Sequence, residues 1–182
     1  PGRPLGVSVL VTAIGTEAFR DVVSLTSVSI PSGVTNLGNY AFYGCSGLTN
    51  VSIPNSVTDI GNATFSGCAI LTSVTIPSSV TNLGNSAFYG CRGLTSVTIP
   101  NKVSAIGNYA FSSCTRLMGI DVDTNNGSYS SLAGVLLNKK QTEIVQYPAG
   151  KGGVYAIPNS VTAVGDTAFY GCTGLTSVTI PN

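Results

Sequence analysis

Hydrophobic and polar residues alternate in short segments that recur every 23 residues along the chain. Five segments read Leu-x-x-Val-x-Ile-Pro and begin at positions 25, 48, 71, 94 and 175. In the third, Val74 and Ile76 lie on one face, and Ser73 and Thr75 lie on the other. This alternation of β-branched residues predicts a short strand. The proline that follows predicts its end, because proline has no N–H to donate.

The same period continues between the strands. In the regular units the proline is followed by Val-x-x-Ile/Leu-Gly, then Ala-Phe and Gly-Cys, with Thr64 in place of alanine in one copy and Ser113 in place of glycine in another. The glycine, as at Gly84, predicts a positive φ angle or a close backbone approach. A unit with one apolar face buries that face only when copies stack. We therefore predict a solenoid with a parallel sheet, its neighbouring strands about 4.8 Å apart. The arm between strand and cysteine is too short for long helices, so we expect short strand, turn or 3₁₀ pieces.

The phenylalanines and cysteines occupy fixed places in the unit. Val22 stands where later copies have cysteine, and the chain has neither histidine nor a C-x-x-C pair. These facts favour buried thiols that act as small apolar residues over metal ligands or disulfides. We predict that both columns form the structural core and that the chain holds no metal: Phe19, Phe42, Phe65, Phe88, Phe111, Phe169, Cys45, Cys68, Cys91, Cys114 and Cys172.

The period breaks once. Ile120 and Ile157 are 37 residues apart, which is 14 more than one period. Within the longer unit, 121–156, residues 135–137 and 143–147 resemble two strands around a polar turn. We predict a β-hairpin island that projects from the stack. The whole chain, 1–182, this island included, is predicted to be one domain and a fragment of a longer array.

The combined pattern L-x-x-V-x-I-P-x-x-V-x-x-I-G-x-x-A-F-x-x-C resembles the leucine-rich repeats of bacterial BspA-like surface proteins. The resemblance covers 7–182, and the segment 126–158 is similar to a longer variant unit of such arrays. It implies a right-handed leucine-rich-repeat superhelix with a parallel sheet on one face and short irregular or 3₁₀ segments on the other. It also implies a secreted or cell-surface adhesin that binds host matrix proteins such as fibronectin or fibrinogen.

Composition narrows the function. Only 8% of residues are charged and the net charge is +1, so the clustered Lys and Arg of a nucleic-acid-binding protein are missing. No apolar run approaches the roughly 20 residues of a transmembrane helix, so no membrane insertion is expected. Without histidine, and with scattered acids, the sequence predicts neither an enzyme nor a cofactor.

One segment resembles a calcium loop. Asp121, Asp123 and Asn125 alternate before Gly127, and oxygen ligands at alternate positions suit a hard cation. The glycine comes one place late for an EF-hand, and Leu132 stands where a glutamate ligand would be. A turn rich in Asp, Asn and Gly is the alternative that we favour.

Two surfaces are candidate binding sites. The outward positions of the strands define a strand face, which solenoids commonly use for docking: Ser29, Ser52, Thr75, Thr98 and Thr179 in one column, and Ser27, Asn50, Ser73, Ser96 and Ser177 in the other. The other arm carries an aromatic edge: Tyr43, Tyr89 and Tyr170. We predict a protein partner on either surface. A structural spacer or self-assembling scaffold is the alternative, and carbohydrate binding by the strand face is a third function.

Overall fold

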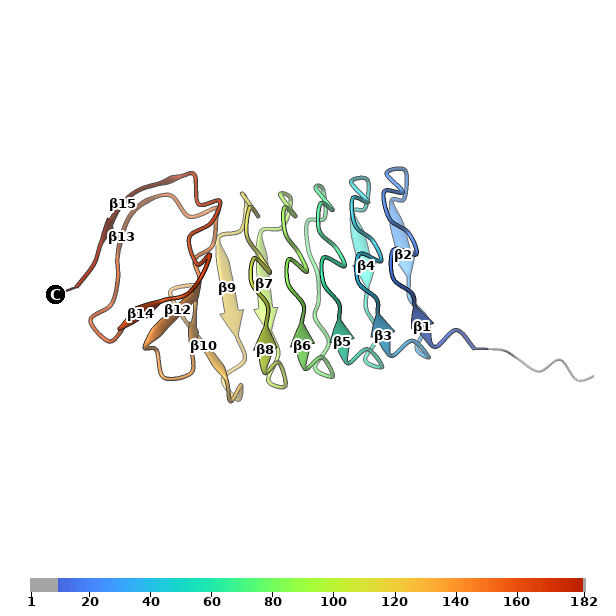
Figure 1. Ribbon diagram of the computed structural model, residues 1–182, viewed down its shortest axis with the longest axis horizontal. Helices are drawn as coiled ribbons and strands as arrows, with labels where there is room; N and C mark the ends of the chain where they lie inside the picture. The colour runs from blue at the N-terminus through green and yellow to red at the C-terminus, as the bar shows by residue number, and fades with distance from the viewer. Residues whose placement is uncertain (1–9, 182) are drawn as a thin grey trace, which may run out of the picture.

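The computed structural model describes residues 10–181, and it is an elongated β-solenoid in which each regular 23-residue unit forms one turn (Figure 1). The described residues contain no helix, and all regular structure is in short strands. The predicted repeat solenoid is therefore confirmed.

One arm of the stack carries a five-stranded parallel sheet. Its strands pair at a constant offset of 23 residues, as Leu37 does with Ile60. They come from the Val-x-x-Ile/Leu segments, so the short strands expected on this arm are confirmed: β1 (Ala13–Ile14), β3 (Asn36–Leu37), β5 (Asp59–Ile60), β6 (Asn82–Leu83) and β8 (Ala105–Ile106). The Ala-Phe segments are turns, so this arm consists of the short strand and turn pieces that were expected, without a 3₁₀ segment among residues 10–181.

The Leu-x-x-Val-x-Ile segments pair less continuously than predicted. They form separate two-stranded parallel ladders: β2 (Ser27–Ser29) with β4 (Asn50–Ser52), β7 (Ser96–Ile99) with β9 (Gly119–Val122), and β13 (Gly153–Ala156) with β15 (Leu175–Thr179). The strand predicted around Val74 and Ile76 joins no ladder. Both side chains are nevertheless buried, so apolar packing holds this segment in its turn.

The longer unit contains the predicted hairpin of β11 (Val135–Asn138) and β12 (Glu143–Gln146). An additional strand, β10 (Tyr129–Leu132), pairs antiparallel with β11. The expectation that this island projects from the stack is wrong. Val135, Leu136 and Leu137 are fully buried, and β12 pairs in parallel with β14 (Ala163–Val164). Three consecutive apolar residues need cover on both faces of the strand, which a projecting hairpin cannot supply.

The phenylalanine column fills the interior. The rings of the regular turns stack nearly parallel, with centroids 5.2–5.4 Å apart from Phe19 to Phe111. Four of the six rings have no exposed surface, whereas Phe19 is 37% exposed in the first described turn and Phe169 is partly buried. Tyr147 stacks on Phe169 at 5.2 Å and so takes a phenylalanine's place in the longer unit.

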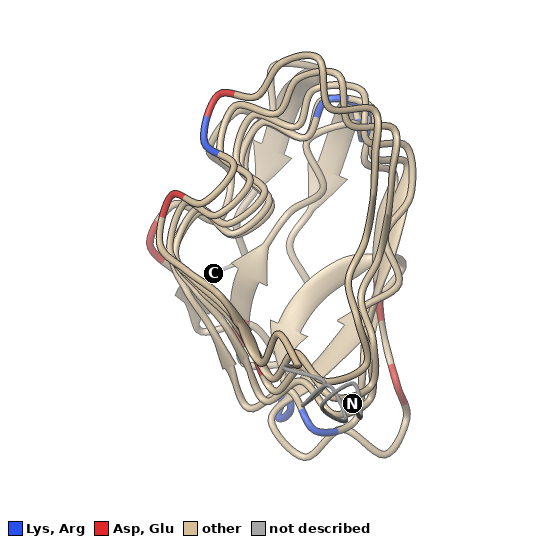
Figure 2. Cartoon of the chain, turned by 90° about the vertical axis from the view of Figure 1, so that its right-hand side faces the viewer, with Lys and Arg blue, Asp and Glu red and all other residues tan. Residues whose placement is uncertain are grey.

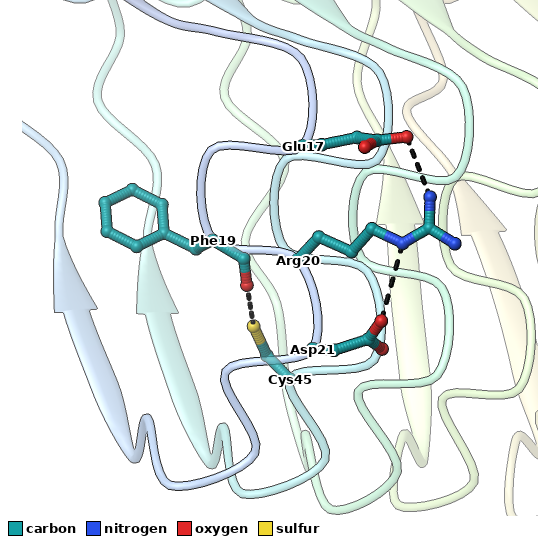
Figure 3. A network of polar contacts seen from close by, with 5 residues as sticks. All are labelled: Glu17, Phe19, Arg20, Asp21 and Cys45. Atoms are coloured by element: carbon teal, nitrogen blue, oxygen red, sulfur yellow. Dashed lines mark hydrogen bonds and ion pairs between the residues drawn. The ribbon is translucent and has the colours of Figure 1, made fainter.

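The cysteines form a second ladder beside the rings. Each thiol of the regular turns donates to the phenylalanine carbonyl of the preceding turn, over 3.0–3.3 Å, as Figure 3 shows for Cys45 and Phe19. Cys172 donates to the Tyr147 carbonyl at 3.6 Å and is only partly buried. All five thiols are free. Burial raises the pKa of Cys68 and Cys114 to about 12, and it raises the pKa of the Cys91 thiol as well.

The glycine of the Val-x-x-Ile/Leu-Gly segment marks a close approach of two turns. A Cβ atom on Gly84 would lie 2.6 Å from the Asn62 backbone nitrogen, and Gly107 is equally crowded. Neither glycine has a positive φ angle, so of the two expected roles the close backbone approach is confirmed. The left-handed conformation falls two residues later, at a non-glycine position that recurs in every turn of this type: Glu17, Tyr40, Ala63, Ser86, Tyr109 and Thr167.

We predict that Gly84→Ala destabilises the chain by about 2 kcal/mol or more, because the new Cβ can be accommodated only if two turns of backbone move apart. Gly127→Ala is the matched control, since a Cβ there meets no atom within 4 Å. Urea unfolding followed by circular dichroism measures both variants. Equal stability of the two would contradict the close-approach role.

We also predict a loss of stability in alkali. The buried thiols stay protonated in the folded chain, whereas those of the unfolded chain ionise above their ordinary pKa of 9.0. Their contribution is complete below pH 9 and falls as the pH rises toward about 12, because the unfolded state then binds fewer protons.

Urea unfolding at about pH 8 and about pH 10.5 measures this slope. The control is Cys91→Val, since Val22 occupies the same position in an earlier turn. This variant should lose less stability between the two pH values than the parent chain, and an unchanged slope would show that the thiols do not cause it.

Candidate binding surfaces

The strand face is exposed along the regular stack. All ten predicted side chains lie at the surface, and the ladder sets Ser27 beside Asn50 and Ser29 beside Ser52. At the far end Thr98 pairs with Asp121. Asp121 therefore extends the column of Ser29, Ser52, Thr75 and Thr98. This position could have been predicted from the sequence, because Asp121 follows Thr98 by one period of 23 residues.

The structure does not bring all ten residues together. β13 lies between the regular stack and β15, and it sets Val154 beside Ser177 and Ala156 beside Thr179. β13 and β15 form their own ladder at the end of the solenoid (Figure 1). The continuous part of the strand face thus consists of the eight residues from Ser27 to Thr98.

A shallow hollow lies in the middle of this surface. It has a volume of about 330 Å³, and its walls include Thr75, Thr98 and Asp123. It coincides with the segment that joins no ladder. Asp123 also accepts a hydrogen bond from the Asn125 backbone at 2.8 Å, which is the turn geometry that we favoured over a calcium loop.

The aromatic edge is divided into two clusters. At one end Arg20 lies over the rings of Tyr40 and Tyr43, at 5.8 and 5.1 Å. At the other end Tyr170 lies 6.2 Å from Tyr89 and 5.1 Å from Tyr109. Sequence reasoning selected Tyr43, Tyr89 and Tyr170 but did not foresee the role of Arg20.

Arg20 is itself held by two carboxylates. It donates to Glu17 at 2.7 Å and to Asp21 at 3.4 Å, as Figure 3 shows, and the bond to Glu17 is the main cause of its raised pKa. These are the two ion pairs formed among residues 10–181. Charged positions are few and of mixed sign around the outline of the turns in Figure 2, so neither candidate surface carries a strong field.

A cavity occupies the junction with the longer unit. It has a volume of about 380 Å³ and separates β8 from β12. The Tyr129 hydroxyl reaches across and accepts the Ile106 N–H at 3.0 Å. Glu143 and Asp166 lie on the cavity wall, but no three His, Cys, Asp or Glu side chains gather as a metal site anywhere between residues 10 and 181.

Nothing in this arrangement points to catalysis. The chemistry on offer is hydroxyl groups, amides and tyrosine rings on a rigid stack, which suits recognition. Over the same 172 residues no helix is long and apolar enough to cross a membrane.

Comparisons with solved structures agree with this picture. A leucine-rich repeat protein from Bacteroides ovatus is 33% identical, with a TM-score of 0.66 over 94% of this chain and 53% of that one. One from Eubacterium ventriosum is 27% identical, with a TM-score of 0.69 over 86% of this chain and 48% of that one. The T. pallidum leucine-rich repeat protein is 26% identical, with a TM-score of 0.65 over 95% of this chain and 64% of that one. This chain therefore spans about half to two thirds of the length of these proteins.

Among curated proteins no sequence matches the chain. The family model described as "BspA type Leucine rich repeat region" matches six copies, over residues 11–133 and 154–182. On the repeat, the solenoid and this match, the chain belongs to the BspA-type leucine-rich repeat family.

Proposed function

We propose that this chain is a non-catalytic protein-binding module at the cell surface, with the strand face as its main contact surface. The observation that carries the proposal is the exposed part of that face on four successive turns, eight uncharged polar side chains that recur at the repeat period. The repeat family supports an interaction or surface role. A rigid surface loses little conformational entropy on binding, so weak individual contacts can add up.

Adhesion to host matrix proteins, such as fibronectin or fibrinogen, is the specific form of this proposal. It is supported by the resemblance of the repeats to BspA-like surface proteins. The surface also makes a physical prediction about such binding. Because the exposed face of Ser, Thr and Asn carries no charge before Asp121, the affinity should change little with salt, unlike that of a charged interface.

We predict that Thr75→Glu combined with Thr98→Glu reduces binding more than tenfold, because two carboxylates would be buried without partners in the interface. The measurement is surface binding of the purified chain to immobilised fibronectin and to fibrinogen at physiological salt. Thr115→Glu combined with Thr173→Glu is the matched control, since both threonines are exposed in turns on another part of the solenoid. Thermal unfolding checks that both variants fold.

Saturable binding that is lost only in the strand-face variant would support the proposal. Binding that survives in both variants would move the contact to the aromatic edge. No binding at high micromolar concentration would reject these matrix partners and favour a spacer or self-assembling scaffold, which sedimentation would then reveal as monomer or as growing assemblies.

A further inference from the structure

The arm that carries the Ala-Phe turns, which we call the turn arm, has one column that alternates between large and small side chains from Tyr43 onward. Successive turns place Arg20, Tyr43, Ser66, Tyr89 and Ser112 there, and Tyr170 follows from the last unit. Ser66 therefore lies between Tyr43 and Tyr89, which are two turns apart. Ser112 lies between Tyr89 and Tyr170, and there the longer unit comes between the serine and the second tyrosine. The two serine positions are equivalent in the repeat but have different surroundings.

The gap over Ser112 is closed. The Tyr170 ring lies 6.2 Å from Tyr89 and meets Tyr109 edge-on at 5.1 Å. The neighbouring Gly171 backbone packs against Ser113, where a Cβ on Gly171 would be 2.9 Å from the Ser113 Cα. The Ser112 hydroxyl also donates to the Gln146 side chain at 3.2 Å, so the chain fills this gap with its own residues.

The gap over Ser66 is open. Here Arg20, from the preceding turn, lies 5.1 Å from the Tyr43 ring centre, on the side away from Tyr89. Tyr40, from the same turn as Tyr43, meets it at 5.8 Å and also lines the gap. The turn between the two tyrosines lines the gap with Asn62, Ala63 and Ser66, and of these Ala63 and Ser66 are nearly fully buried. A cavity of about 370 Å³ remains, which we call the tyrosine slot.

The dimensions of the slot suit one inserted ring. Two turns separate the Tyr43 and Tyr89 backbones by about 9.6 Å. A ring held between two others needs about 7 to 8 Å, which is two carbon–carbon contact distances. The gap is therefore wide enough for one flat side chain and too narrow for a folded element such as a helix, whose diameter is about 10 Å.

Two side-chain amides of the slot offer unused donors. Asn62 uses its Oδ1 to accept the Asn85 N–H at 2.8 Å, and Asn85 uses its Oδ1 to accept the Asn108 N–H at 2.9 Å. Both amides line the slot, and their Nδ2 groups have no acceptor among residues 10–181. No charged side chain lines it. Tyrosine walls with unused amide donors match a polyproline II segment, which presents flat rings and free backbone carbonyls.

We propose that the tyrosine slot binds a proline ring of a polyproline II segment in a protein partner. The proposal rests on the protein-binding function above and names a second contact, on a different arm from the strand face. The partner's proline inserts between Tyr43 and Tyr89, and the two asparagine amides donate to carbonyls on either side of it. Because polyproline II is ordered before binding, the single slot loses little affinity to chain ordering.

The test is calorimetric titration of the chain with an acetylated, amidated hexaproline peptide, beside a Gly-Ser peptide of the same length. We expect saturable binding of hexaproline in the high micromolar to low millimolar range, and none of the Gly-Ser peptide. Ser66→Tyr fills the slot with the residue that neighbouring turns carry at this position, so it should fold and weaken binding at least tenfold. The Thr115→Glu/Thr173→Glu variant changes exposed residues that do not line the slot and should bind as the parent does.

Arg20→Ala is a second variant, which should release Tyr43 to lean over Ser66 and so weaken binding as well. Failure of hexaproline to bind, or equal binding by the Ser66→Tyr variant, would overturn the proposal. The strand-face variant Thr75→Glu/Thr98→Glu should bind hexaproline normally. Loss of matrix binding in that variant, with no hexaproline binding by any chain, would reject the slot and leave the proposed function standing.

Discussion

The axial spacing between turns is the constraint on which the rest of the structure depends. Hydrogen bonds between parallel strands hold neighbouring turns about 4.8 Å apart. At that spacing the phenylalanine rings stack at 5.2–5.4 Å, and each thiol reaches the carbonyl of the preceding turn. The same spacing leaves no room for a Cβ at Gly84. Core residues are therefore held in place by the equivalent residues of neighbouring turns. A substitution in one turn consequently alters the packing of the next.

The sequence was sufficient to predict features that every turn shares. Period 23 and the alternation around Val74 gave the solenoid, the inward faces and the phenylalanine column. It could not predict which strands would pair, because Val74 and Ile76 are as apolar as the residues of β7 and yet join no ladder. The burial of 135–137 was also missed, since a polar turn between two apolar runs describes a projecting hairpin and a packed one equally well.

The candidate surfaces were predictable as columns but not as shapes. Exposure of Ser, Thr and Tyr follows from their fixed place in the unit, so residue numbers alone identified them. The direction in which a tyrosine leans depends on its neighbours. Arg20 holds Tyr43 on one side, and Tyr170 covers Ser112 because the longer unit brings it there. Repetition therefore makes the surface regular, and residues that depart from the repeat, such as Arg20, give individual turns their own local shape.

The longer unit shows how such departures can be tolerated. At the junction the backbone ladder of β1 to β8 stops, and side chains replace its bonds. The Tyr129 hydroxyl accepts the Ile106 N–H, and the Thr167 hydroxyl accepts the Tyr109 N–H at 3.4 Å. Tyr170 then joins the aromatic cluster of the preceding turns. Because side chains bridge the gap, the unit can be longer without uncoupling the turns on its two sides, and the outward columns keep their alignment on the turn arm.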